Sequence, residues 1–291
     1  MALWIGCNTL FPDEYFPDPN TFTLEKLRVS LDRLAALNFE AVEFSHYMHL
    51  SDGEATEAGE YCRSLGLLAW SAHAAGSAAV ATASEREKTL AEKALCIRLA
   101  ERLGVKIMVY HVASYDSAVY AAGVPADLLR AEAAVLAELS RQASDVGIRI
   151  AVENGESVAV MNYLIALVNE VDSEALGICV DTGHAALGDL GPARAIRMAA
   201  DKLYSLHLQD NWGGADHHLP PGCGKIDWCE VAQALAEVNY RGVLMAECTD
   251  SPLGHRPYHK ELELRIAAAT LWRLRESVRG ARLGDRKRRC C

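Results

Sequence analysis

Residues 203–207, Leu203-Tyr204-Ser205-Leu206-His207, form a short apolar run that ends in a side chain able to bind a metal ion. Three other runs share this pattern: 148–153, 176–181 and 243–247, which end at Glu153, Asp181 and Glu247. Their length and composition predict β-strands. Successive final residues are 28, 26 and 40 positions apart, which leaves room for a helix and its loops. The four side chains can meet only if these strands are parallel neighbours with their carboxyl ends together.

The rest of the chain continues this alternation of strands and helices. Four earlier strands are predicted at 3–7, 41–45, 67–72 and 105–110. Apolar spacing and terminal Gly or Pro residues predict helices at 23–37, 54–65, 85–103, 125–146, 158–171, 192–200, 228–238 and 259–278. Such alternation is typical of parallel strands joined by crossover helices. Eight units in about 280 residues predict an α/β fold, a (β/α)8 TIM barrel formed as a single domain by residues 1–278.

Composition and charge restrict the classes of function. The net charge is −10, and the last 13 residues carry +5, so residues 1–278 carry −15. Because an acidic body attracts polyanions poorly, nucleic acid is an unfavoured partner. No apolar run approaches the roughly 20 residues that span a bilayer, so no membrane partner is expected. No Gly-rich phosphate loop follows the first strand, which argues against an open nucleotide-binding sheet.

Two further features predict the location of the protein and the nature of its C-terminal end. The nine cysteines include no CxxC pair, and several lie in apolar runs, which predicts reduced thiols in a cytoplasmic protein. The first residues read as a strand and not as a signal peptide. Residues 279–291 are polar and basic, and we predict that they form a disordered tail.

The four strand-end residues predict a metal centre at the carboxyl-end mouth of the barrel. Glu153, Asp181, His207 and Glu247 provide three carboxylates and one imidazole. Such an oxygen-rich set suits Mn²⁺, Mg²⁺ or Co²⁺, with Zn²⁺ as an alternative. A single carboxylate after a strand can equally be a helix cap. Four such residues at the same place in their strands favour the metal interpretation.

Three histidines are predicted to reach the same mouth. His184 follows Asp181 in the turn Asp-Thr-Gly-His, and it could bind a second ion or donate a hydrogen bond to a substrate hydroxyl. His73 and His111 follow the third and fourth strands, where they could bind an additional ion or the substrate. A structural role, as a capping or core histidine, stays open for each of them.

The long loop after residue 207 contains further candidates. Asp216 and His218 are two residues apart, a spacing that can present both to one additional ion. Trp212 and Lys225 are candidates for contact with the substrate, although a core position is the alternative for the tryptophan. Asp227 is predicted to cap the following helix.

At these positions the chain resembles the xylose isomerase-like barrel superfamily. The resemblance rests on Glu-Asn at 153, Asp-x-x-His at 181, His-x-x-Asp at 207, the final Glu247, and the loop Asp-x-His-x-x-Pro-Gly-x-Gly-x-Ile-Asp-Trp at 216–228. This superfamily contains sugar isomerases and epimerases, inosose-processing enzymes and abasic-site nucleases of the endonuclease IV type. The motifs are specific for the superfamily and weak for the choice of substrate.

The resemblance implies two different sets of roles. In the ketose epimerases the positions of Glu153, Asp181, His207 and Glu247 would hold one divalent ion, with the two glutamates as the acid–base pair and His184 on the substrate. In the nuclease branch a three-ion cluster uses the positions of nine residues, all present here: His73, His111, Glu153, Asp181, His184, His207, Asp216, His218 and Glu247. However, His-Val-Ala replaces the usual His-Pro-Gly at 111–113, and Gly183 replaces the usual Cys.

We therefore expect a divalent-metal-dependent isomerase or epimerase that acts on a keto sugar or polyol through an enediolate. Glu153 and Glu247 would be its acid and base. A dehydratase-like lyase acting on an inosose, a multi-zinc abasic-site nuclease and a non-catalytic sugar-binding barrel are the alternatives. The resemblance also implies a homo-oligomer.

Overall fold

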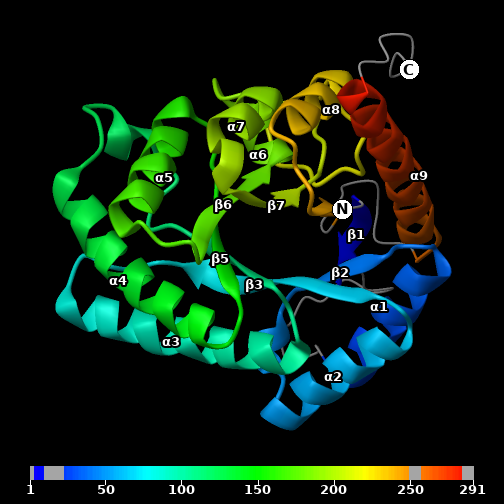
Figure 1. Cartoon of the computed structure of the whole chain (residues 1–291), viewed down its shortest axis with the longest axis horizontal. Coiled ribbons are helices and arrows are strands. Elements are labelled where there is room, and N and C mark those ends of the chain that lie inside the picture. Colours follow the sequence, from blue (N-terminus) through cyan, green and yellow to red (C-terminus); the bar gives the residue numbers. More distant parts are fainter. Residues whose placement is uncertain (1–2, 10–22, 249–256, 284–291) are drawn as a thin grey trace.

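The computed structural model describes residues 3–9, 23–248 and 257–283, and its eight strands form one parallel sheet curled into a barrel (Figure 1). The strands are β1 (Trp4–Asn8), β2 (Ala41–Phe44), β3 (Leu68–Ser77), β4 (Ile107–His111), β5 (Arg149–Glu153), β6 (Leu176–Asp181), β7 (Leu203–His207) and β8 (Val243–Ala246). Each strand pairs with its sequence neighbours from β1 to β7, and β1 also pairs with β8. The predicted (β/α)8 barrel is confirmed.

The barrel closes between β7 and β8 just beyond the end of β7. The amide of Leu208 donates to the Met245 carbonyl at 2.7 Å, and the amide of Glu247 donates to the Leu208 carbonyl at 3.1 Å. This parallel bridge lies at the carboxyl end of both strands. Because the bridge joins Leu208 to Ala246, it holds the neighbouring residues His207 and Glu247 close to each other.

Helices cover the outside of the barrel (Figure 1). They are α1 (Leu24–Ala36), α2 (Asp52–Ser64), α3 (Ala83–Leu103), α4 (Ala126–Asp145), α5 (Val158–Val171), α6 (Thr182–Leu187), α7 (Pro192–Ala199), α8 (Trp228–Glu237) and α9 (Pro257–Arg282). The helices α2 and α3 begin with capping boxes at Ser51 and Thr82, which explains why both start slightly before the predicted positions. Among the residues that the structure describes, no helix has the length and apolar character needed to cross a membrane.

Three further differences from the predicted elements concern the carboxyl end of the barrel and the end of the chain. Strand β3 continues past Ala72 to Ser77, because Ser77 pairs with His111 after a register shift. The short helix α6 replaces a predicted turn, since the Asp181 carboxylate accepts a hydrogen bond from the His184 amide at 2.7 Å and caps it. Helix α9 continues to Arg282 and so includes the first residues of the predicted tail, while 284–291 lie outside the described residues.

Helix α4 brings a buried carboxylate to the loop that follows β4. Glu132 is fully buried, and it accepts hydrogen bonds from the Ala113 amide at 3.0 Å and from the Tyr163 hydroxyl at 2.6 Å. Burial raises the pKa of Glu132 from its ordinary value of 4.5 to about 7. This carboxyl group therefore changes its charge near neutral pH.

We expect the Glu132→Gln variant to differ from the parent in the pH dependence of its stability. Between the ordinary pKa of 4.5 and the folded-state pKa of about 7, the folded protein binds the Glu132 proton more tightly than the unfolded chain does. The contribution of Glu132 to the parent's free energy of unfolding therefore falls with rising pH in this window, by about 3 kcal/mol in total. Glutamine remains neutral and escapes this loss. Urea unfolding of both proteins across the window tests this, and parallel pH profiles would contradict it.

Candidate active site

Four of the predicted residues converge at the carboxyl end of the barrel. The ligand atoms of Glu153, Asp181, His207 and Glu247 all lie within 4.8 Å of one another. The side chains of Glu153 and His207 are at most 1% exposed, whereas that of Glu247 is 12% exposed. They come from β5, β6, β7 and the position after β8, so adjacent parallel strands deliver them to one point.

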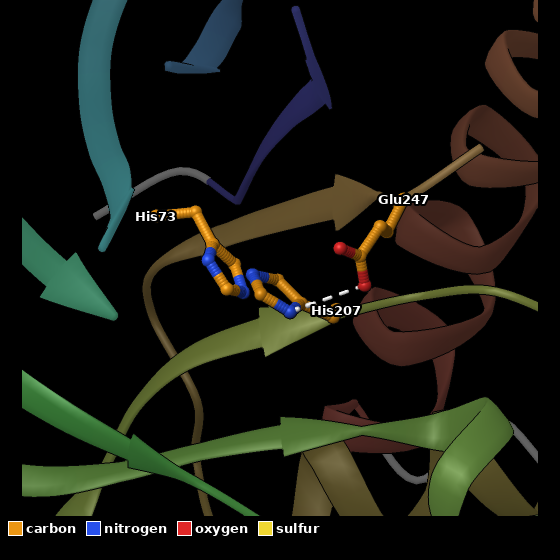
Figure 2. Close-up of side chains that lie close together, drawn as sticks. All are labelled: His73, His207 and Glu247. Carbon is orange, nitrogen blue, oxygen red and sulfur yellow. Dashed lines mark ion pairs between the residues drawn. The ribbon is translucent and has the colours of Figure 1, made fainter. Parts of the chain in front are cut away.

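The imidazole of His207 lies at the centre of this group. Its Nδ1 is 3.1 Å from Glu153 Oε1. The same nitrogen is 3.2 Å from Glu247 Oε2, the ion pair drawn in Figure 2. Its Nε2 is 3.0 Å from Oε2 of Glu43, a fully buried carboxylate on β2 that also accepts a hydrogen bond from Ser71 Oγ at 2.7 Å. Glu43 was not among the predicted site residues. Strand alternation gives the signal, because residues 41 and 43 share one face and Ala41 packs inside the barrel.

His73 and His111 converge on the second oxygen of Glu153, as predicted for side chains at this mouth. His111 Nε2 is 2.9 Å and His73 Nε2 is 3.3 Å from Glu153 Oε2. The three residues form a second group with metal-ligand spacing. The His73 ring also stacks on that of His207, with centroids 5.5 Å apart (Figure 2).

A third group joins α6 to the long loop. His184 Nε2 is 3.2 Å and His218 Nε2 is 3.6 Å from Asp216 Oδ2. His184 Nδ1 lies 3.5 Å from Glu153 Oε1, which connects this group to the first. Gln209 Nε2 donates to Asp216 at 2.6 Å and lies 3.4 Å from Asp181 Oδ2. The structure therefore brings His184, Asp216 and His218 to the same site.

Asp210 fixes the conformation of the long loop. Its buried carboxylate accepts hydrogen bonds from the Gly222 amide at 3.1 Å and from Trp228 Nε1 at 2.9 Å. Gly222 has a φ of +88°, and a Cβ on Gly224 would lie 2.2 Å from Asp210 Oδ1. Glycine is therefore required at both positions. Asp227 caps α8 by accepting from the Cys229 and Glu230 amides, as predicted.

The predicted substrate contacts Trp212 and Lys225 do not reach the described cavity. Trp212 is 43% exposed, and its Nε1 donates to the Cys223 carbonyl at 3.2 Å within the loop. Lys225 is exposed to solvent. Contact of these two side chains with a substrate therefore stays a prediction.

A cavity of about 400 Å³ opens onto the three groups. Its described lining combines site residues with the ends of β2 and β3: Ser45, His46, Met48, His73, Ala74, Ala75, Gly76, His111, Glu153, His184, Asp216, His218 and Glu247. A polar lining with a few apolar walls, in a volume of this size, suits a small polar ligand. The extension of β3, which the sequence did not predict, supplies the wall at 74–76.

Comparison with known families identifies the fold. The sequence profile of the family described as xylose isomerase-like TIM barrel matches residues 31–272. The chain belongs to the xylose isomerase-like TIM barrel family. The predicted resemblance is thereby confirmed for most of the chain.

Several members of the xylose isomerase-like family are similar to this chain. A D-psicose 3-epimerase from Enterocloster bolteae is 33% identical over 117 residues, which cover 38% of this chain and 37% of that protein. An L-ribulose 3-epimerase from a Methylomonas species is 28% identical over 125 residues, covering 41% and 42%. The chain thus matches less than half the length of these curated relatives.

Solved structures of the family support the fold over the whole chain. The structure of an L-ribulose 3-epimerase has a TM-score of 0.77, with 18% identity, and both chains are covered completely. A D-tagatose 3-epimerase-like protein has a TM-score of 0.73 and 24% identity, covering 95% of this chain and 98% of the other. At this level of identity the likeness establishes the fold alone.

The charge balance in this xylose isomerase-like barrel fits a divalent cation. Burial, with the Glu247 and Glu153 carboxylates nearby, raises the pKa of Asp181 to about 7 although His184 lowers it. Although burial opposes it, the charge of His207 holds the pKa of Glu153 and of Glu247 below the usual range. Several carboxylates thus share a buried space, and a bound cation would relieve their repulsion. The donor set is one that could hold a metal ion.

Proposed function

We propose that the protein is a divalent-metal-dependent sugar epimerase that acts on a keto sugar, with Glu153 and Glu247 as its acid–base pair. The observation that carries this proposal is the position of the two carboxylates. Both line the cavity, and their oxygens lie 3.1 and 3.2 Å from the same nitrogen of His207. The 3-epimerases among the relatives support the reaction class.

The metal would be held by Glu153, Asp181, His207 and Glu247. Three carboxylates and one imidazole suit Mn²⁺, Mg²⁺ or Co²⁺. When bound, the ion would polarise the substrate carbonyl and stabilise the negative charge that develops beside it. The close spacing of the four ligand atoms supports this assignment.

The two glutamates would move the proton that inverts the sugar carbon. One carboxylate accepts the proton from the carbon next to the carbonyl, which leaves an enediolate, and the other, once protonated, returns a proton to the opposite face. Glu247 is 12% exposed and can exchange its proton with solvent through the cavity. His73, His111 and His184 line the same cavity, where their ring nitrogens can hydrogen-bond to sugar hydroxyls.

A second candidate is phosphodiester cleavage at abasic sites by several ions. The group of His73, His111 and Glu153 favours it, because its spacing suits a further ion. The charge of −15 on residues 1–278 opposes a DNA substrate.

The test is deuterium exchange by the purified protein in heavy water with Mn²⁺. D-psicose, D-fructose, D-tagatose, L-ribulose and an inosose form the substrate panel. We expect deuterium at C3 of at least one ketose, together with its 3-epimer, as seen by NMR. Exchange on the inosose alone, with loss of water, would indicate a lyase instead. Nicking of abasic-site DNA without exchange on any sugar would replace the proposal with the nuclease.

A further inference from the structure

The barrel interior contains a carboxylate for which the proposed proton transfer has no use. Glu43, on β2, is completely buried. It contacts Nε2 of His207, whereas Glu153 and Glu247 contact Nδ1. Its Oε2 accepts from Ser71 Oγ at 2.7 Å and faces His207 Nε2 at 3.0 Å. Its Oε1 is buried and makes no hydrogen bond with the described residues.

Each ring nitrogen of His207 faces a carboxylate: Nε2 faces Glu43 Oε2 at 3.0 Å, and Nδ1 faces Glu153 Oε1 and Glu247 Oε2. Because carboxylates accept hydrogen bonds, the ring without a cation can donate from both nitrogens. A cation bound by Nδ1 would replace the hydrogen there, and Glu43 would remain as the acceptor for the hydrogen on Nε2. The opposite tautomer would place a hydrogen where a cation has to bind.

We propose that Glu43 is a positioning residue that fixes the Nε2–H tautomer and the ring orientation of His207, so that Nδ1 is presented to the divalent ion. This inference rests on the metal centre of the proposed function and adds a residue to it. A carboxylate that acts on the second nitrogen of a metal-binding imidazole typically strengthens metal affinity by 10- to 100-fold.

Packing alone gives no reason for a carboxylate at this position. Burial of an acidic group with one unpartnered oxygen costs free energy that an apolar side chain on the same strand face would not. Ala41, on that face, shows that the interior accepts a small apolar residue. The contact with His207 is the feature that an apolar side chain could not provide.

The decisive experiment compares Mn²⁺ affinity in the parent, Glu43→Gln and Glu132→Gln by isothermal titration calorimetry. Glutamine has no charge, its carbonyl oxygen is a weaker acceptor for the Nε2 hydrogen than a carboxylate, and its NH2 can instead donate to Nε2 and favour a hydrogen on Nδ1. We therefore expect the Mn²⁺ dissociation constant of Glu43→Gln to rise about 10- to 100-fold. Glu132→Gln makes the same substitution at another buried carboxylate, one with partners at Ala113 and Tyr163. Its dissociation constant should match the parent's.

The outcomes separate this inference from the proposed function. Equal Mn²⁺ affinity in the parent and Glu43→Gln overturns the role of Glu43 and leaves the metal centre intact. A parent that binds no divalent ion overturns both. If Glu43→Gln does not fold, nitrogen-15 NMR of the Zn²⁺-loaded parent with labelled histidine decides. We expect His207 to carry its hydrogen on Nε2, and a hydrogen on Nδ1 refutes the inference.

Discussion

Glutamine in place of Glu153 or Glu247 is expected to lower the rate of epimerisation by about a thousandfold, within the range that positioned acids and bases contribute. An amide has nearly the same shape as a carboxylate but cannot accept the proton from the sugar carbon. Because both residues are also expected to bind the ion, the rates should be measured at saturating Mn²⁺. The measurements are turnover of the responding ketose and deuterium uptake at its C3.

Glu132→Gln provides the matched control, since the Glu132 carboxylate is buried on the inner face of α4, where it contacts Ala113 and Tyr163, and does not line the cavity. Its turnover should equal that of the parent. If Glu153→Gln and Glu247→Gln exchange deuterium as fast as the parent when saturated with Mn²⁺, the two-glutamate mechanism is wrong. A loss confined to one of them would assign both proton transfers to that residue.

Removal of the divalent ion is expected to abolish turnover and to reduce stability together. Four carboxylates, those of Glu43, Glu153, Asp181 and Glu247, lie at or beside the centre, and chelation leaves their repulsion unscreened. Mn²⁺ at a hundred times its dissociation constant should raise the free energy of unfolding by about 2.7 kcal/mol. For a chain of this size that corresponds to roughly 4–5 °C in Tm.

Asp181→Asn and Asp227→Asn form the matched pair for this experiment. Asp181 belongs to the proposed ligand group, whereas Asp227 caps α8 outside it. The Mn²⁺-dependent rise in Tm should disappear in the first variant and persist in the second. Full activity of the chelated parent would contradict the metal requirement.

The barrel and the convergence of its strand-end residues could both be predicted from the repeated unit of a strand, a polar residue at its end and a helix. Carboxyl ends of neighbouring parallel strands meet at one rim, so a polar residue at the end of each run has to reach a common point. Glu153, Asp181, His207 and Glu247 do so. Their chemical roles remain predictions, which the variants above test.

Other parts of the site depend on contacts that the sequence pattern does not encode. Strand β3 extends to Ser77 because of its pairing with His111, and nothing in the alternation of apolar residues marks that pairing. The position of Trp212 depends on its hydrogen bond to the Cys223 carbonyl, in a loop that the Asp210 carboxylate holds through the Gly222 amide. Glu43 lies inside the predicted strand 41–45 and not at its end, so the pattern of strand-end residues does not select it, although strand alternation places it on the inner face.

The closure of the barrel at Leu208 has a consequence for local unfolding. Within the described chain, β7 and β8 share this single bridge, so the wall between them opens more easily than the paired strands opposite. His207 and Glu247 stand on the two edges of that weak point. A cation bound by both side chains would crosslink β7 and β8. Binding of the metal ion would therefore reduce local opening of the barrel, and its removal would increase it.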